Sequence, residues 1–166
     1  MKDLYLRQLN VSDGEDIYDM LQRIGSCENE FKNTANGLTY DEYKAWLIQQ
    51  DNWSKGDNLP ENYVAQTIFW LFEEDKPVGI GKIRHELNCH SRTIGGNIGY
   101  AIDPVNRGKG YATELLKLLI HKAREIGVKE TLLSVEKYNP ASKKVIEKNG
   151  GKQINENDDR WFFTFD

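Results

Sequence analysis

Apolar residues near the start of the chain recur by threes and fours, which is the period of an amphipathic helix. Residues 15–24 form the first such segment, and Ser12 or Asp13 is expected to cap it. A second helix is expected to begin at Thr39, after an Asn-rich polar stretch over residues 28–37. The pattern therefore predicts two helices in the first third of the chain.

The same period returns twice in the second half of the chain. A long amphipathic helix is predicted between Gly110 and Gly127, where a glycine is a natural C-terminal stop. Asn139 followed by Pro140 is typical of an N-cap and a first helical position, so a shorter helix is predicted from there to about Asn149. Four helices are predicted in all.

Strands are predicted where apolar residues run continuously or alternate with polar ones. Residues 67–72 are continuously apolar, β-branched or aromatic, as expected of a strand covered on both faces. Residues 98–102 alternate instead, which predicts a half-buried strand. The other predicted strands are residues 4–9, 78–84, 131–135, 152–154 and 161–165. The polar segment 52–62 is expected to be loop, and the polar segment 85–96 is expected to be a loop or a ragged hairpin. Residues 1–166 are expected to form one α+β domain.

Composition and charge narrow the class of protein. Hydrophobic residues make up 39% of the 166 positions and charged residues 29%, which is typical of a soluble globular protein. The longest apolar run is far shorter than the roughly 20 residues of a membrane helix, and the N-terminal residues do not resemble a secretory signal. A cytoplasmic protein with no membrane partner is therefore expected. The net charge of −4 argues against nucleic acid as a partner.

The two cysteines indicate neither a disulfide framework nor a metal site. Cys27 and Cys89 lie far apart in the sequence, without CxxC spacing and without a companion histidine pair. No histidine or helix start is placed to activate either thiol as a nucleophile. Ordinary reduced thiols and no metal are expected.

The most informative segment places Arg107-Gly108-Lys109-Gly110 between a strand and a helix. A helix N-terminus offers unpaired N–H groups and a positive dipole end, and two glycines let the backbone approach a phosphate closely. The segment is neither a P-loop, since Gly110 stands at its Ser/Thr position, nor a GxGxxG fingerprint, since Thr113 stands at its last glycine. On residues alone it predicts a phosphate-bearing ligand, and the alternative is a solvated tight turn.

The flanking residues extend this pattern to a known family. Arg107-Gly108-Lys109-Gly110-Tyr111-Ala112 resembles [RQ]-x-x-G-x-[GA], the acetyl-CoA signature of the GNAT (GCN5-related) N-acetyltransferase superfamily. Residues 98–104 resemble the family's fourth strand, and Asn139-Pro140-Ala141-Ser142 resembles its Asn-x-x-Ser. The resemblance implies a GNAT fold, in which a mostly antiparallel, mixed sheet of six to seven strands has splayed fourth and fifth strands and about four flanking helices.

The resemblance also implies a cofactor and its site. The pantetheine arm of acetyl-CoA would pair with the strand edge, a backbone N–H near Ile102 would polarise the thioester, and the pyrophosphate would lie on the glycine-containing loop. Transfer to the amine would be direct. The residues that it assigns to the cofactor are Tyr100, Ala101, Ile102, Arg107, Gly108, Lys109, Gly110, Tyr111, Ala112, Thr113, Asn139 and Ser142.

Catalytic residues are less clearly indicated. The tyrosine that the family often places seven residues after the asparagine is replaced by Ile146, and Tyr138 is the nearest phenol, with packing at a strand end as the alternative. Glu136 and His85 are candidate bases, and each could equally be a solvated surface group. A module that binds acyl-CoA without turnover therefore stays open as the second interpretation, and an interaction domain without cofactor as the third.

The acceptor is expected to be a primary amine on a small molecule or a peptide end. The acidic residues of the two segments that flank the acceptor site in the family would attract a cation, unless they are merely solvated; they are Glu28, Glu30, Glu156, Asp158 and Asp159. Bacterial GNAT proteins of unassigned substrate carry patterns similar to residues 84–88, Gly95-Gly96 and residues 145–151. The aromatic content leaves room for a homodimer.

Overall fold

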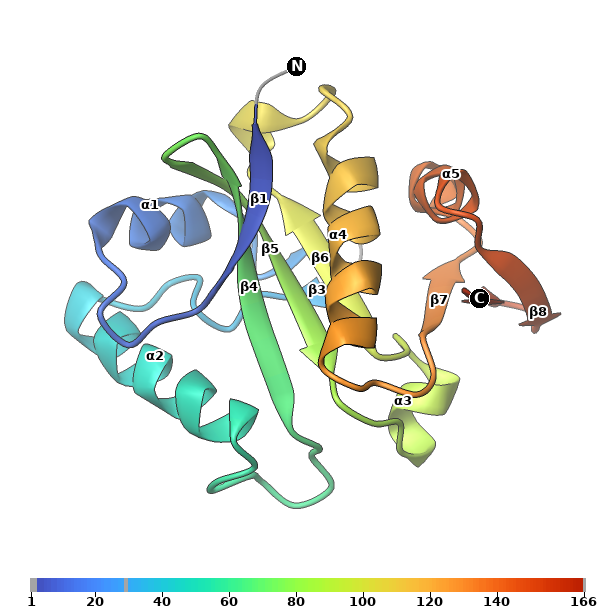
Figure 1. Cartoon of the computed structure of the whole chain (residues 1–166), viewed down its shortest axis with the longest axis horizontal. Coiled ribbons are helices and arrows are strands. Elements are labelled where there is room, and N and C mark those ends of the chain that lie inside the picture. Colours follow the sequence, from blue (N-terminus) through green and yellow to red (C-terminus); the bar gives the residue numbers. More distant parts are fainter. Residues whose placement is uncertain (1–2, 29, 166) are drawn as a thin grey trace.

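A computed structural model describes residues 3–28 and 30–165, and within them an antiparallel sheet of four strands forms the centre of the fold (Figure 1). Its strands, in spatial order, are β1 (Leu4–Gln8), β4 (Gln66–Glu73), β5 (Lys76–Arg84) and β6 (Ile98–Ile102). The register is continuous between β5 and β6, where Gly79 faces Ile102 and Ile83 faces Ile98. One edge of β6 is thus paired, and its other edge borders the second half of the fold.

A second antiparallel sheet follows in the order β7-β9-β8. Its strands are β7 (Leu132–Glu136), β8 (Lys152–Glu156) and β9 (Arg160–Thr164). The prediction of seven main strands, with the fourth and fifth splayed, is confirmed, since β6 and β7 belong to separate sheets in the described part of the chain. A short hairpin of β2 (Cys27–Glu28) and β3 (Phe31–Lys32) lies in the Asn-rich stretch and was not predicted.

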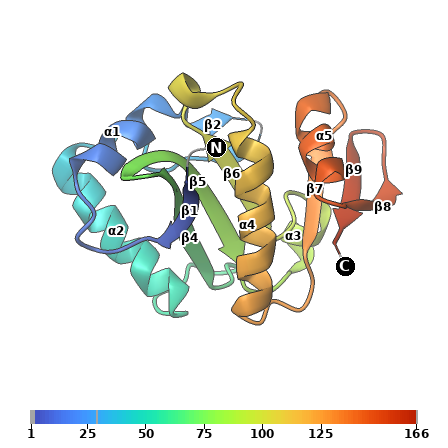
Figure 2. The ribbon, with the colours of Figure 1, turned by 45° about the horizontal axis from the view of Figure 1, so that its top comes forward.

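Helices cover both faces of the first sheet. Figure 2 shows α1 (Glu15–Arg23) and α2 (Tyr40–Ser54) on one side and α4 (Tyr111–Glu125) on the other. Helix α5 (Pro140–Lys148) lies beside the second sheet. Among the described residues, no helix combines the length and the apolar character needed to cross a membrane.

The described residues contain five α-helices, one more than the four predicted. Helix α3 (Cys89–Thr93) forms in the segment expected to be loop, because Asn88 accepts a hydrogen bond from the Ser91 amide and Ser91 Oγ accepts one from the Asn88 amide. A single 3₁₀ turn, η1 (Pro104–Asn106), follows β6. Helix α2 also runs three residues into the segment expected to be loop, ending at Ser54.

The core consists of two apolar clusters, one on each face of the first sheet. Phe69 and Leu71 of β4 pack with α4, whereas Ile68 and Trp70 pack with α1 and α2. This confirms that β4 is covered on both faces, as its continuous apolar run predicted. The sheet therefore separates an α4 side from an α1/α2 side.

The helix caps were predicted in part. Thr39 caps α2 in a capping box with Glu42, and Asn139 caps α5, as predicted. The prediction for α1 was wrong, because Gly14 is its N-cap and makes no side-chain cap. Asp13 instead accepts hydrogen bonds from the Trp70 indole and the Asn10 amide, both at 2.8 Å, and its carboxylate pairs with Arg7. The Asp13 carboxylate therefore binds the Trp70 indole instead of the amides at the start of α1.

The two sheets meet at Asn97, immediately before β6. Its amide donates to the Leu132 carbonyl at 2.9 Å, and its side-chain oxygen accepts from the Leu132 amide at 2.8 Å. Strands β6 and β7 therefore start side by side and separate toward their ends. Gly96, with a φ of +62°, fits against the same strand start, where an added Cβ would lie 1.9 Å from the Leu132 carbonyl oxygen.

Candidate active site

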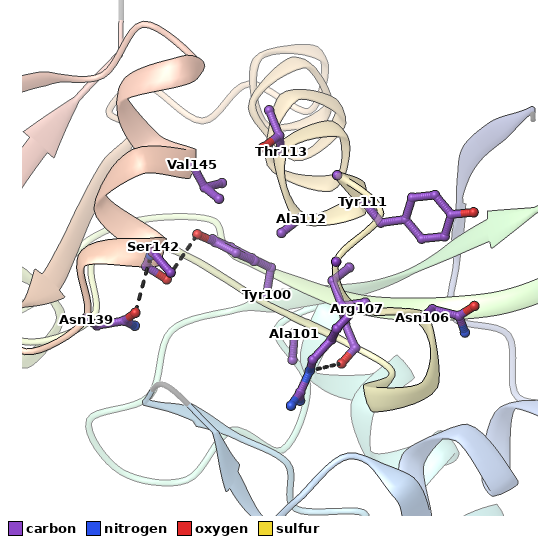
Figure 3. Close-up of a pocket in the computed structure, with 14 residues that line it drawn as sticks. Tyr100, Ala101, Asn106, Arg107, Tyr111, Ala112, Thr113, Asn139, Ser142 and Val145 are labelled. Carbon is purple, nitrogen blue, oxygen red and sulfur yellow. Dashed lines mark hydrogen bonds between the residues drawn. The ribbon is translucent and has the colours of Figure 1, made fainter. Parts of the chain in front are cut away.

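A pocket with a volume of about 380 Å³ opens where β6 and β7 have separated (Figure 3). It lies between the end of β6, the start of α4 and the start of α5. The residues that line it are Tyr100, Ala101, Ile102, Asn106, Arg107, Gly108, Gly110, Tyr111, Ala112, Thr113, Asn139, Ala141, Ser142 and Val145.

A buried ion pair fixes the chain as it leaves β6 toward the pocket loop. Asp103 is fully buried and accepts three hydrogen bonds from Arg23 of α1, the shortest at 2.7 Å from Nη2. The same carboxylate accepts from the Val105 amide and so caps η1. The hydrogen bonds that Arg23 donates to Asp103 raise the pKa of Arg23 above its usual range. The start of the loop is thereby anchored to the opposite side of the sheet.

Two glycines shape the loop where it enters α4. Gly108 and Gly110 have φ values of +77° and +82°, a conformation that side chains rarely adopt, and no atom lies within 4 Å of a Cβ added at either position. The first helical bond runs from the Glu114 amide to the Gly110 carbonyl, so the N–H groups of the first turn have no acceptor within the helix. The result is an open, positively polarised helix end facing a pocket.

The pairing of β6 decides which of its backbone groups face this pocket. The Arg84 amide donates to the Asn97 carbonyl, and the Asp103 amide donates to the Val78 carbonyl. Because antiparallel strands alternate, the odd-numbered residues of β6 direct their backbone groups toward β5. The backbone groups of Tyr100 and Ile102 therefore point to the open edge, where the Ile102 carbonyl accepts from Arg107 Nε at 3.3 Å.

Side chains from both halves of the fold meet across the pocket. Figure 3 shows the Tyr100 phenol reaching toward Ser142, with 3.5 Å between the two hydroxyl oxygens. Asn139 Oδ1 accepts from the Ser142 amide at 3.3 Å, which orients the start of α5. Burial raises the pKa of Tyr100 above its usual value, so this phenol stays protonated at neutral pH.

Eleven of the twelve residues predicted to contact the cofactor line this pocket. Lys109 does not, because its ammonium turns back to Asn106 Oδ1, at 3.4 Å, and lies over the Tyr111 ring. Three lining residues were not predicted as site residues, namely Asn106, Ala141 and Val145. The last two stand one helical turn apart in α5 beside Ser142, so the apolar residues that share a face of that helix were the available signal.

The three predicted catalytic residues lie outside the pocket lining. Tyr138 is 75% exposed. Glu136 accepts a hydrogen bond from Arg160 Nη2 at 3.2 Å. His85 Nε2 is 2.7 Å from Thr67 Oγ1, and burial lowers the pKa of this histidine. Their catalytic roles stay predictions, and Ile146, at the family's tyrosine position, is buried in the core.

The acidic residues predicted to attract a cationic acceptor are partly neutralised by the chain itself. Glu30 accepts a hydrogen bond from Arg160, and Glu156 pairs with Lys137 at 2.7 Å. The side chain of Glu28 lies outside the described part of the structure. Asp158 and Asp159 lie between β8 and β9, as predicted. The carboxylate charge available to an acceptor is therefore smaller than the sequence suggests.

Comparisons with known proteins agree with this geometry. A family described as "Acetyltransferase (GNAT) domain" matches residues 3–152. A search of curated protein sequences finds no match.

Several solved structures share the fold. A ribosomal-protein-S5-alanine acetyltransferase from Vibrio fischeri has a TM-score of 0.73 and 18% identity, covering 99% of this chain and 93% of its own. Campylobacter jejuni N-acetyltransferase PseH in complex with acetyl coenzyme A has a TM-score of 0.65 and 13% identity, covering 98% of both chains. Spermidine N-acetyltransferase from Vibrio cholerae has a TM-score of 0.64 and 20% identity, covering 98% and 92%.

Proposed function

The chain belongs to the GNAT acetyltransferase superfamily, and from that premise we propose that it is an acetyl-CoA-dependent N-acetyltransferase acting on a primary amine. One observation carries the proposal. The pocket combines a helix end suited to a diphosphate with an unpaired strand edge at Tyr100 and Ile102, in one continuous space. A coenzyme that carries a diphosphate at one end and a thioester on an amide-containing arm matches both features.

The loop residues fit the diphosphate of such a coenzyme. The glycine cradle leaves open space where a side chain at Gly108 or Gly110 would otherwise project, and the first-turn N–H groups of α4 supply donors. Arg107 adds a guanidinium at the pocket lining. Lys109 contributes positive charge to the loop from outside the lining. A solved neighbour with the same fold contains acetyl coenzyme A, which supports the assignment.

The strand edge would receive the arm and orient the acyl group. Bound there, acetyl-CoA supplies an activated acetyl group. The outward N–H groups of Tyr100 and Ile102 are placed to donate to the arm and to the oxygen on which negative charge develops. The acceptor nitrogen, in its uncharged form, attacks the thioester carbon; the C–N bond forms, the C–S bond breaks, the nitrogen loses a proton and the thiolate gains one.

We place the proton donor at the Tyr100 and Ser142 hydroxyl pair rather than at Tyr138. Both hydroxyls line the pocket, whereas the Tyr138 phenol is largely in solvent. Burial keeps Tyr100 protonated, which a donor requires. Glu136 and His85 each make a contact within the protein, so either one would have to release that contact before accepting a proton.

The test is to mix the protein with acetyl-CoA and a panel of primary amines, and to measure thiol release and acetylated product by mass spectrometry. At least one amine is expected to be acetylated, with one thiol released per product. Tight acetyl-CoA binding without turnover of any amine would favour an acyl-CoA-binding module instead. Absence of binding would contradict the proposal altogether.

A further inference from the structure

Two cations on β5 lie on the α1/α2 side of the first sheet. Lys82 and Arg84 are two residues apart, so their side chains project to the same face. Lys82 Nζ lies 5.4 Å from the centre of the Phe31 ring, and Arg84 Nη1 donates to the Gly96 carbonyl at 3.0 Å. Among the side chains that the structure describes, no carboxylate forms an ion pair with either of them.

These two charges are partly buried, which makes them expensive to leave unpaired. Burial, together with the nearby charges of Arg84 and Lys32, lowers the pKa of Lys82 to about 8. Burial also lowers the pKa of Arg84 below its usual value. A bound anion would offset the free-energy cost of desolvating the two cations and would reduce the repulsion between them.

The pair lies one step along the sheet from the proposed acyl site. In the β5–β6 register, Lys82 faces Gly99 and Ile80 faces Ala101, which lines the pocket. A two-residue step along a strand is about 7 Å. Phe31 of β3 packs over Gly99, where an added Cβ would lie 3.3 Å from its ring, so β3 borders the same place (Figure 1).

A third cation near Lys82 and Arg84, namely Arg160, is already neutralised by carboxylates. Arg160 of β9 contacts both Glu30 and Glu136, and its Nη1 donates to Ser134 Oγ at 3.0 Å. Ser134 Oγ in turn accepts from the Gly95 amide, next to the glycine that receives Arg84. Among the side chains that the structure describes, Arg160 is therefore matched by carboxylates, whereas Lys82 and Arg84 are not, although the chain as a whole is acidic.

We propose that Lys82 and Arg84 bind a carboxylate of the acceptor, so that the substrate class is a small primary amine with a carboxylate a few bonds from the nitrogen, such as a free amino acid. This inference rests on the proposed N-acetyltransferase function and replaces the cationic acceptor that the acidic loops suggested. The same two cations disfavour a protonated amine beside them, which promotes the uncharged form that attacks the thioester.

Matched acceptors test the inference. Each amino acid of a panel (L-alanine, L-serine, L-methionine, L-glutamate and β-alanine) is compared with its carboxamide at pH 7.5, with kcat/KM expressed per concentration of uncharged amine. The wild type is expected to favour at least one carboxylate over its amide by about tenfold or more. Lys82→Met and Arg84→Gln should each reduce that preference to about threefold or less, by raising the KM of the acid far more than that of the amide, with acetyl-CoA affinity unchanged.

Two controls separate the possible failures. Lys129→Met removes an equal charge from an exposed position and should leave the preference intact. In the presence of CoA, the preferred amino acid should raise the melting temperature of the wild type but not that of Lys82→Met, a readout that needs no turnover. Acetyl-CoA binding with equal use of acids and amides, or with no carboxylate-dependent melting shift, overturns the inference alone. Loss of acetyl-CoA binding to the wild type overturns the proposed function.

Discussion

The pocket loop differs in construction from the region beside it, which is called the cationic face and consists of Lys82, Arg84 and the Arg160 ion-pair cluster. The loop from Asp103 to Thr113 is one continuous segment, and it offers the pocket mainly backbone N–H groups and the space left by two glycines. The cationic face gathers side chains from β3, β5, β7 and β9 that lie far apart in the sequence. The loop suits a ligand part that is common to a whole family, whereas the face can change with few substitutions and suits a variable acceptor.

The largest predicted effect concerns Gly96, next to the cationic face, where the two sheets meet. Gly96→Ala should lower the free energy of unfolding by at least about 3 kcal/mol, because the added Cβ meets the Leu132 backbone and the φ of +62° strains an alanine. Chemical denaturation measures the loss. Gly37→Ala is the matched control, since Gly37 has a φ of +88° but open space, and its loss should be only about 1 kcal/mol. Equal losses would contradict a tight junction.

Breaking the Arg160 ion pairs of the cationic face should have the next largest effect. Arg160→Met leaves Glu30 and Glu136 without their shared cation, which should destabilise the fold by about 2 to 4 kcal/mol. Lys137→Met breaks an ion pair with Glu156 that lies at the surface, and a smaller loss is expected there. Equilibrium unfolding in urea compares the two variants. If Arg160→Met proves as stable as Lys137→Met, the buried cluster is not a fixed part of the fold.

Stability is expected to depend on pH because of Lys82, in the cationic face. Because folding lowers the pKa of Lys82 from the usual 10.5 to about 8, the unfolded chain binds more protons between these values. The penalty for folding this lysine is therefore fully present below pH 8 and is lost as the pH rises to 10.5, a gain on the order of 1 to 3 kcal/mol. Unfolding measured in this range should show the gain in the wild type and lack it in Lys82→Met. Identical pH profiles would argue that Lys82 is solvated.

The smallest effect is expected at the phenol that the sequence singled out. Tyr138→Phe should leave kcat within about twofold, because the side chain is 75% exposed and outside the pocket. Ser142→Ala, which removes a pocket hydroxyl, should lower kcat by about tenfold or more while acetyl-CoA affinity changes little. Single-turnover thiol release measures both. The reverse ranking would return the proton donor to Tyr138.

The sequence predicted those features that short, continuous patterns determine. The period of apolar residues located the strands and four helices, and Thr39 and Asn139 act as caps because capping depends on neighbours three residues away. Asp13 failed as a cap because its carboxylate binds a residue 57 positions later, Trp70. No local pattern contains that information.

The same reasoning explains what was predicted of the site. The motif at 107–112 and the strand before it located nearly all of the pocket lining, because that lining is mostly contiguous. The contacts of Glu136, His85 and Glu30 join separate strands and hairpins, so their internal partners could not be anticipated. Lys82 and Arg84 looked like ordinary strand residues until the register placed them beside the pocket.

Calorimetric titration of three proteins with acetyl-CoA tests whether the loop before α4 binds the diphosphate. Gly110→Asp places a carboxylate at the N-terminal end of α4, whereas Gly127→Asp makes the same substitution just past its C-terminal end, where φ is +86° and space is equally open. If the loop binds the diphosphate, the wild type and Gly127→Asp should bind acetyl-CoA tightly, and Gly110→Asp should bind it at least about tenfold more weakly. Equal affinity of all three proteins, or no binding by the wild type, would contradict diphosphate binding by the loop.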